Sequence, residues 1–88
     1  MPVHCFRSRE VEITAARWDG RNLSEILDFT GPGNLKIDRS GSVLLRNTEE
    51  RAWIPIPPGH WVIKGVRGEF YPCSDAVLKA KYDPVGQL

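Results

Sequence analysis

Apolar and polar residues alternate over much of this chain, and the alternation predicts most of its elements. Between residues 11 and 18, the apolar positions Val11, Ile13 and Ala15 are separated by polar ones. A period of two is typical of a strand with one buried face. The sequence Asp19-Gly20 then predicts a turn that ends this strand.

A short helix is predicted next. Its apolar residues fall three and four positions apart and so share one face: Leu23, Ile26 and Leu27. Asn22 can cap the helix, and Glu25 three residues later completes a capping-box pattern. The Gly-Pro-Gly sequence at 31–33 predicts the end of the helix after about two turns, too few to be stable alone in water. We therefore expect this helix to pack on a sheet.

Short strand patterns separated by turn residues fill the middle of the chain. The segments predicted as strands are 35–38, 43–46, 52–56, 61–64 and 69–71. Pro55 has no N–H for a sheet ladder, so the 52–56 strand is expected at a sheet edge or at a bulge. The residues from Gly65 to Gly68 predict a compact hairpin turn. Such short connections are typical of antiparallel pairing.

A second helix pattern begins after Ser74, which can cap it, and Asp75 in its first turn suits the helix dipole. The residues predicted to form its buried side are Val77, Leu78 and Tyr82. Asp83-Pro84 predicts its end. Together these elements indicate an α+β fold: a small, strongly bent antiparallel sheet or open barrel with two short helices on one face or end.

Length and composition narrow the class of protein. The 88 residues suffice for a single domain, 1–88, whose ends 1–8 and 84–88 we expect to be loosely ordered. The formal net charge is +1 and the cationic residues form no basic run, which argues against nucleic-acid binding, sequence-specific recognition included. Without a leader-like or membrane-spanning apolar segment, we expect a cytoplasmic protein with no membrane partner and with Cys5 and Cys73 as free thiols.

One stretch carries a resemblance to a known family. Residues 57–73 read PPGHWVIKGVRGEFYPC, and they resemble the C-terminal core of a family of small phage-encoded and prophage-encoded proteins. The segment 11–18 and the helix ending in Phe29-Thr30-Gly31 are similar to the same family. The resemblance implies a tailed-phage origin and action in the cytoplasm of an infected bacterium, and it brings no catalytic residues. Members usually carry an acidic residue where this chain has His60, which argues against an essential acid–base or metal role there.

The hairpin and the tryptophans are the best candidates for a binding surface. Trp53 lies out of phase with the apolar residues of its strand and is expected to point outward, as is one of Trp61 and Val62, whereas Trp18 and Phe70 are expected in the core. The residues predicted to bind a ligand or partner are Trp53, Trp61, Lys64, Arg67, Glu69 and Tyr71. A plainer interpretation is that the glycines only satisfy turn geometry and the charges are solvated.

These observations predict a phage-encoded, non-enzymatic binding protein that needs no cofactor and forms a homo-oligomer. Its partner is expected to be a host protein or a small anionic ligand, bound through the hairpin face. A second hypothesis is a sponge that sequesters an anionic nucleotide signal, with Lys64 and Arg67 on phosphate. A small cysteine- or carboxylate-dependent enzyme is a third hypothesis, and a minor component of the virion is a fourth.

Metal and nucleophile chemistry have weaker support. The residues that could ligate zinc are His4, Cys5, His60 and Cys73, but they lack the close spacing of paired zinc ligands, so no metal site is predicted. Cys73 precedes a predicted helix N-terminus and could react if His60 lay beside it. The plainer interpretation is a small apolar plug where the hairpin meets the last helix. Glu49-Glu50 is predicted to be a solvated turn.

Overall fold

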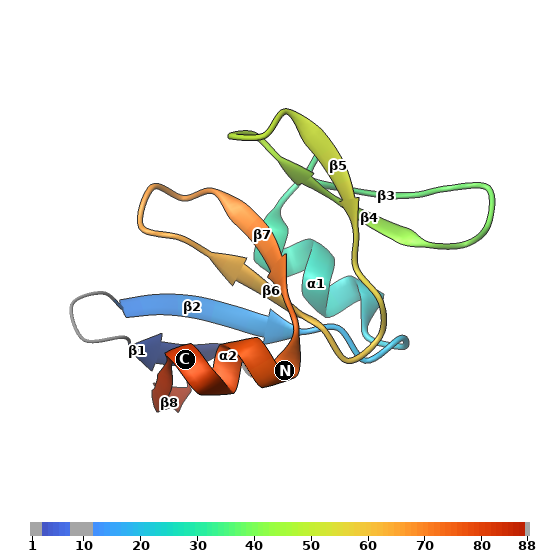
Figure 1. Cartoon of the computed structure of the whole chain (residues 1–88). Helices are drawn as coiled ribbons and strands as arrows, with labels where there is room; N and C mark the ends of the chain where they lie inside the picture. The colour runs from blue at the N-terminus through green and yellow to red at the C-terminus, as the bar shows by residue number, and fades with distance from the viewer. Residues whose placement is uncertain (1–2, 8–11, 88) are drawn as a thin grey trace.

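The computed structural model describes residues 3–7 and 12–87 and confirms the α+β class (Figure 1). In chain order its elements are β1 (His4–Arg7), β2 (Glu12–Arg17), α1 (Leu23–Thr30), β3 (Leu35–Ile37), β4 (Val43–Asn47), β5 (Ala52–Pro55), β6 (Trp61–Lys64), β7 (Phe70–Cys73), α2 (Asp75–Lys81) and β8 (Asp83–Gln87). Every strand pair is antiparallel. Within the described ranges the strands form an open five-stranded sheet, ordered β7-β6-β2-β1-β8, and a three-stranded sheet, ordered β3-β4-β5, with no closed barrel.

The five-stranded sheet is covered on both faces. On one face α2 places Leu78 in a core that also holds Ile13, Ala15, Trp61 and Ile63. On the opposite face the neighbouring positions of the same strands enter a second core, beneath α1 and the three-stranded sheet (Figure 1). Because side chains alternate along a strand, a sheet covered on both sides buries consecutive residues.

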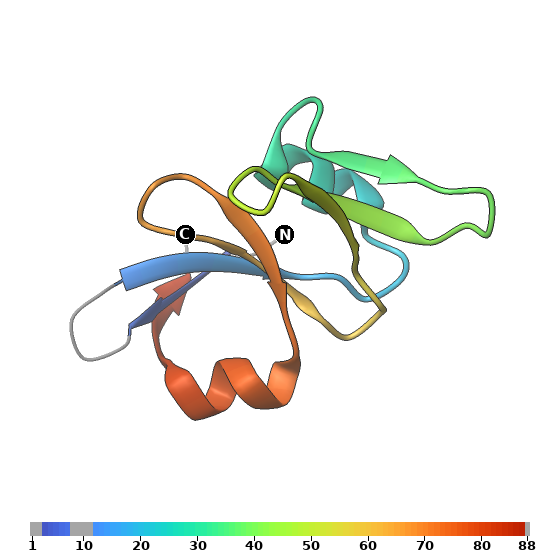
Figure 2. The same ribbon diagram turned by 45° about the horizontal axis from the view of Figure 1, so that its top comes forward.

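The three-stranded sheet has one covered face only. Its inward residues Val43 and Leu45 pack with Ile26 of α1 and with Val62 and Ile56 in the second core. Leu35 and Ile37 of β3 pair with Leu45 and Val43, so their side chains lie on the same face of the sheet as these two residues. No element lies over the opposite face in either view of the described chain (Figures 1 and 2). The strand β5, which carries Pro55, is an edge strand, as the missing N–H predicted.

Both helices begin and end close to the predicted residues, but their caps differ. Ser74 caps α2 as predicted, because its hydroxyl accepts a hydrogen bond from the Val77 N–H at 3.2 Å. The capping box at α1 is wrong: the Asn22 side chain makes no cap bond and instead joins the preceding turn, accepting from the Asp19 N–H at 3.0 Å and donating to the Arg17 carbonyl at 2.7 Å. At the end of α1, the Gly31 N–H donates to the Leu27 carbonyl at 2.8 Å.

The buried faces of the helices are narrower than predicted. Ile26 and Leu78 are fully buried, whereas Leu27 is 42% exposed and Val77 is 44% exposed. Each helix therefore contacts its sheet through a narrow stripe, and the prediction that Val77 lies on the buried side of its helix is wrong. None of the helices among the described residues is long and apolar enough to span a bilayer.

Two strands were not predicted. The segments His4–Arg7 and Asp83–Gln87, which lie largely within the ends expected to be loose, pair with each other as β1 and β8. The pairing register shifts between Cys5 and Phe6, which marks a bulge or irregularity. Local pattern did not predict either strand. β8 contains Pro84 and Gly86, which are unfavourable in strands, and the four residues of β1 are too few to show a clear period of two. Their pairing extends the five-stranded sheet beyond β2.

Candidate functional site

The residues predicted to bind a partner fall into separate places in the fold. Trp61 and Tyr71 lie on the face of the five-stranded sheet that α2 covers. The residues of the β6–β7 turn and its flanks are Lys64, Arg67 and Glu69. Trp53 lies on the other sheet, in β5. The hairpin therefore does not form a single binding face with Trp53.

Trp61 is a core residue, and the prediction that it or Val62 points outward is wrong. Its side chain is 7% exposed and Val62 is fully buried. The indole meets the rings of Phe6 and His4 edge-on, with centroids 5.3 and 5.4 Å away. Its Nε1–H donates to the Asp75 carboxylate at 2.9 Å, so the polar atom of the indole is satisfied at the start of α2.

Tyr71 also packs against the core. It lies half-buried against the core beneath α2, together with Tyr82 and Cys73. Burial, followed by a hydrogen bond with Tyr82, raises the pKa of the Tyr71 phenol well above its ordinary value. The phenol is therefore neutral at physiological pH and is engaged within the protein.

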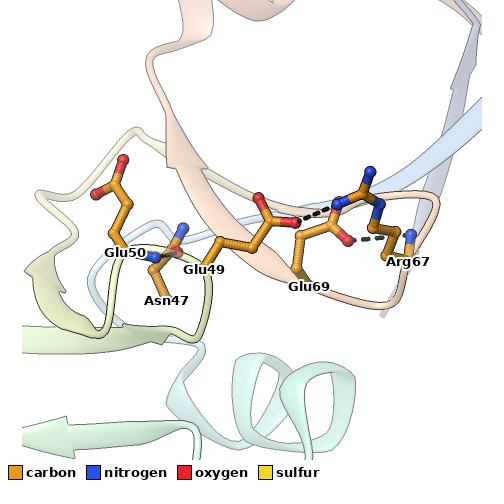
Figure 3. A network of polar contacts seen from close by, with 5 residues as sticks. All are labelled: Asn47, Glu49, Glu50, Arg67 and Glu69. Atoms are coloured by element: carbon orange, nitrogen blue, oxygen red, sulfur yellow. Dashed lines mark hydrogen bonds and ion pairs between the residues drawn. The ribbon is translucent and has the colours of Figure 1, made fainter.

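In the β6–β7 turn, the charged side chain of Glu69 is bound by the backbone of the turn itself. The Arg67 N–H donates to the Glu69 carboxylate at 3.0 Å (Figure 3). This carboxylate lies directly over Gly65. A Cβ at position 65 would collide with it, so glycine there allows the side chain to fold back over the turn. Gly68 has a φ of 81°, which favours glycine. These glycines are explained by turn geometry, the plainer interpretation that the sequence left open.

The β4–β5 turn of the three-stranded sheet lies beside this hairpin of the five-stranded sheet, and side chains of the two turns connect the sheets (Figure 3). Asn47 is buried, with its Nδ2 donating to the Phe70 carbonyl of β7 at 3.2 Å and its Oδ1 accepting from the Glu50 N–H at 2.8 Å. Arg67 reaches Glu49 across the gap at 3.4 Å, and both side chains are largely exposed. Such a surface ion pair contributes about 0–1 kcal/mol, so Asn47 is the stronger of the two connections.

The open face of the three-stranded sheet gathers an aromatic ring and cations. Arg46 pairs directly with Trp53, so their side chains share the outward face. Lys36 reaches over this face from β3 and places its Nζ 4.3 Å from the centre of the Trp53 ring. Trp53 is 39% exposed, as predicted, while Trp18 and Trp61 are each 7% exposed. We call Lys36, Arg46, Arg51 and Trp53 the basic-aromatic face.

A hollow opens beside Trp53. It encloses about 480 Å³ and is lined by Arg46, Thr48, Arg51, Ala52 and Trp53. Arg51 has a φ of 54°, a left-handed conformation that costs a residue with a Cβ about 1–2 kcal/mol. Among the ion pairs of the described chain, none involves Lys36, Arg46 or Arg51. The hollow thus places an exposed indole beside two arginines that form no ion pair with a carboxylate of residues 3–7 or 12–87.

Two further hollows offer fewer groups that could bind a charged ligand. One of about 410 Å³ is lined by Trp18, Gly20, Ser40, Gly41, Ser42, Val43, Pro55, Ile56, Pro57 and Pro58. Another of about 390 Å³ is lined by Cys5, Glu12, Ile13, Thr14, Lys64 and Gly65. Neither contains an exposed aromatic ring beside several cations.

The cysteines are free thiols, and both are half-buried. Burial raises the pKa of the Cys73 thiol, with a smaller opposing effect from the Lys81 charge. The thiolate that the helix N-terminus would favour is therefore disfavoured, and Cys73 packs beside the core beneath α2. Among the described residues, no three His, Cys, Asp or Glu side chains lie together so that they could hold a metal ion.

Comparisons with known proteins identify no relative of this chain. Neither protein-family models, nor curated proteins, nor solved structures give a match to this chain. The candidate site is therefore defined by the geometry of this chain alone.

Sequence reasoning missed part of the basic-aromatic face. It selected Trp53 by its phase within the strand but not Lys36, Arg46 or Arg51. Alternation in the flanking strands does place Lys36 and Arg46 opposite their apolar neighbours. The strand register, which brings them beside Trp53, is the information that the sequence pattern lacked. Asn47 was missed as well, because a polar residue next to a turn gives no sign that it will be buried.

Proposed function

We propose that this chain is a small, non-enzymatic, phage-encoded binding protein that acts in the cytoplasm of an infected bacterium and holds an anionic partner. The resemblance of residues 57–73 to small phage proteins supports its origin. The observation that carries the binding role is Trp53, exposed on an uncovered sheet face among cations that form no ion pair within the described chain.

Physical chemistry favours a partner at this face. Burying the remaining exposed surface of an indole is favourable at about 25 cal/mol per Å² of apolar area, and tryptophan and arginine are enriched among residues that dominate binding energy. Lys36 and Arg46 add positive charge on the same face. A negatively charged host protein or small ligand satisfies both requirements, whereas an apolar partner would leave the cations desolvated.

The test uses the tagged chain, incubated with extract of infected bacteria and washed at low salt. We expect wild type to retain a partner that moderate salt releases, since screening weakens exposed charge attraction. Trp53→Ala is expected to lose the partner, and Val66→Ala, which shortens an exposed side chain on the β6–β7 turn, is expected to keep it. Equal retention by Trp53→Ala would remove the basic-aromatic face from the proposal.

The mass of the retained partner separates binding from catalysis. A binding protein returns its partner unchanged after prolonged incubation, whereas an enzyme returns a product of altered mass. A converted partner would contradict the non-enzymatic proposal and would direct attention to Cys73 and the carboxylates. Abundant protein in purified phage particles would instead support a role as a virion component.

Self-association is proposed as well, because a small domain gains stability when a second copy covers part of its surface. Two copies that met through the basic-aromatic face would bring like charges together, so we place the contact between copies elsewhere. Light scattering coupled to size exclusion measures the molar mass directly, and a homo-oligomer that persists in Trp53→Ala is the expected result. A monomer at all concentrations contradicts this part of the proposal, and a homo-oligomer that dissociates in Trp53→Ala contradicts the anionic partner at this face.

A further inference from the structure

In the folded chain, cationic side chains that are far apart in the sequence lie close together. Lys36, Arg46 and Arg51 are separated along the chain, and the formal net charge of the whole chain is only +1. The antiparallel register of β3, β4 and β5 nevertheless brings Lys36 to the Trp53 ring and Arg46 beside it. Arg51 lines the hollow at the same indole. The lack of a basic run along the sequence therefore says little about this surface.

We propose that the basic-aromatic face binds a nucleotide, with the base against Trp53 and the phosphates on Arg46 and Arg51. The inference rests on the proposed function and names the chemistry of its anionic partner. A hollow of about 480 Å³ lies within the range of about 300–1,000 Å³ that small ligands occupy. Its wall combines the two groups that recognise nucleotides without reading sequence, an indole surface for stacking and cations for phosphate.

The ring and the cations act on different parts of the ligand. An indole attracts the flat face of any base, and a planar guanidinium can stack on a base or bind phosphate through two parallel hydrogen bonds. Lys36 lies over the indole but does not line the hollow, so a base that enters the hollow displaces this lysine or stacks on the side of the ring that the lysine leaves open. An acidic peptide would use the cations but offers no flat ring to Trp53, which makes a nucleotide the better match.

The carboxylates of the β4–β5 turn are oriented in different ways. Glu49 is directed toward Arg67, on the neighbouring hairpin (Figure 3). The Glu50 backbone N–H is held by Asn47, and its carboxylate points away from Arg67 (Figure 3). Glu50 is therefore the turn carboxylate whose charge is not matched by Arg67, and removing that charge in Glu50→Gln is expected to strengthen phosphate binding.

Titration calorimetry with defined probes tests the proposal. The probes are adenosine triphosphate, a short single-stranded oligothymidylate, adenosine, inorganic phosphate and a short polyglutamate peptide. We expect one of the first two to bind at least about tenfold more tightly than adenosine, phosphate or the peptide, because only they join a base to phosphate. Tighter binding of the triphosphate identifies a free nucleotide as the ligand, and tighter binding of the oligonucleotide identifies a single strand.

Variants separate the roles of ring and charge. Trp53→Ala should weaken binding by about tenfold or more, and Trp53→Phe should restore most of it. Arg51→Gly keeps the left-handed turn while it removes the guanidinium, and it should reduce the slope of log affinity against log salt by about 0.7 for a single strand. Arg67→Gln, which removes an exposed cation from the other turn, is the matched control and should leave affinity unchanged.

The outcomes distinguish this inference from the proposed function. Failure of both nucleotide probes to bind at about 1 mM overturns the inference, as does equal or tighter binding of polyglutamate. Nucleotide binding that is lost in Arg67→Gln but kept in Trp53→Ala places the site on the β6–β7 turn and also overturns it. In each case a partner retained from infected-cell extract would still support the proposed binding function, so the two claims fail separately.

Discussion

Trp61 and Trp53 occupy comparable positions, each in a strand that enters a sheet after a turn, yet their surroundings are opposite. Trp61 is 7% exposed, is contacted by aromatic rings and donates to Asp75. Trp53 is 39% exposed, with Lys36 as its ring partner. The first ring is enclosed because α2 covers its sheet face, and the second is open because no described element covers its own (Figure 2).

The difference shows that the same residue type supports stability in one region and is available for binding in the other. Both strands are short and both tryptophans have apolar neighbours. What differs is the layer above each sheet face, which is set by the path of the chain between strands rather than by the strands themselves. We therefore propose Trp53 for binding, whereas Trp61 is a core residue.

The largest expected effect separates the two tryptophans by stability. Trp61→Ala should lower the free energy of unfolding by about 3–5 kcal/mol, because it leaves a cavity under α2. Trp53→Ala should cost about 1 kcal/mol or less, since much of its ring already faces water. Urea denaturation followed by far-ultraviolet circular dichroism measures both.

A loss of about 3–5 kcal/mol is comparable with the total stability of many small domains, so Trp61→Ala can fail to fold. Trp61→Phe then provides the measurement: it keeps a ring in the core but removes the Nε1–H bond to Asp75, at an expected cost of about 1–3 kcal/mol. Equal costs for the alanine variants at positions 53 and 61 would contradict the distinction between the two regions.

A second prediction concerns Asn47, which connects the regions. Asn47→Ala removes the hydrogen bonds to Phe70 and Glu50 at a buried position and should cost about 1–3 kcal/mol of unfolding free energy. Thr48→Ala, at the exposed neighbouring position, is the control and should change stability by less than about 0.5 kcal/mol. If Asn47→Ala were as mild as its control, packing alone would hold the two sheets together.

Much of the fold could be predicted from local pattern. The strand at 11–18, both helices and the turn at 65–68 correspond to elements of the structure, because period-two alternation, capping residues and glycines each act over a few residues. Ser74 is the clearest case, since its hydroxyl bonds the N–H three residues later. The α1 capping box failed where a competing partner, the turn at Asp19, engaged the Asn22 side chain instead.

The candidate site depended on information that local pattern does not hold. Trp53 could be chosen by its phase, but the prediction for Trp61 failed because both faces of its sheet are covered. The division of the strands into two sheets decided both outcomes. Likewise, Arg46 reaches Trp53 only through the register of β4 with β5, and Lys36 only through that of β3 with β4. Long-range pairing thus created the basic-aromatic face.

A third, smaller effect sharpens the contrast at the helix that encloses Trp61. Ser74→Ala removes the cap of α2 and should lower the free energy of unfolding by about 1 kcal/mol. Ser24→Ala, at an exposed position in the first turn of α1, is the matched control and should cost nothing measurable. Since α2 covers Trp61 and not Trp53, Ser74→Ala should also increase acrylamide quenching of the fluorescence measured in a Trp53→Phe background, where Trp61 and the buried Trp18 of the other core are the remaining indoles. Unchanged quenching with unchanged stability would show that the cap does not support this cover.

The smallest expected effect is a dependence on acid pH that belongs to the Trp61 region. Hydrogen bonds from Trp61 and from Lys79 hold the pKa of Asp75 below its ordinary value of 3.8. A lowered pKa in the folded state means that the ionised carboxylate stabilises the native state at all pH values above the ordinary pKa. This contribution is lost as the pH falls through the pKa of the folded state.

The variant Asp75→Asn tests this contribution, because it keeps an oxygen to accept the Trp61 N–H but cannot ionise. Below about pH 4, near the ordinary aspartate pKa, wild type should therefore lose stability more steeply than Asp75→Asn in urea denaturation. Parallel pH profiles would mean that the carboxylate charge contributes nothing to the enclosure of Trp61 and that the hydrogen bond alone orients the indole.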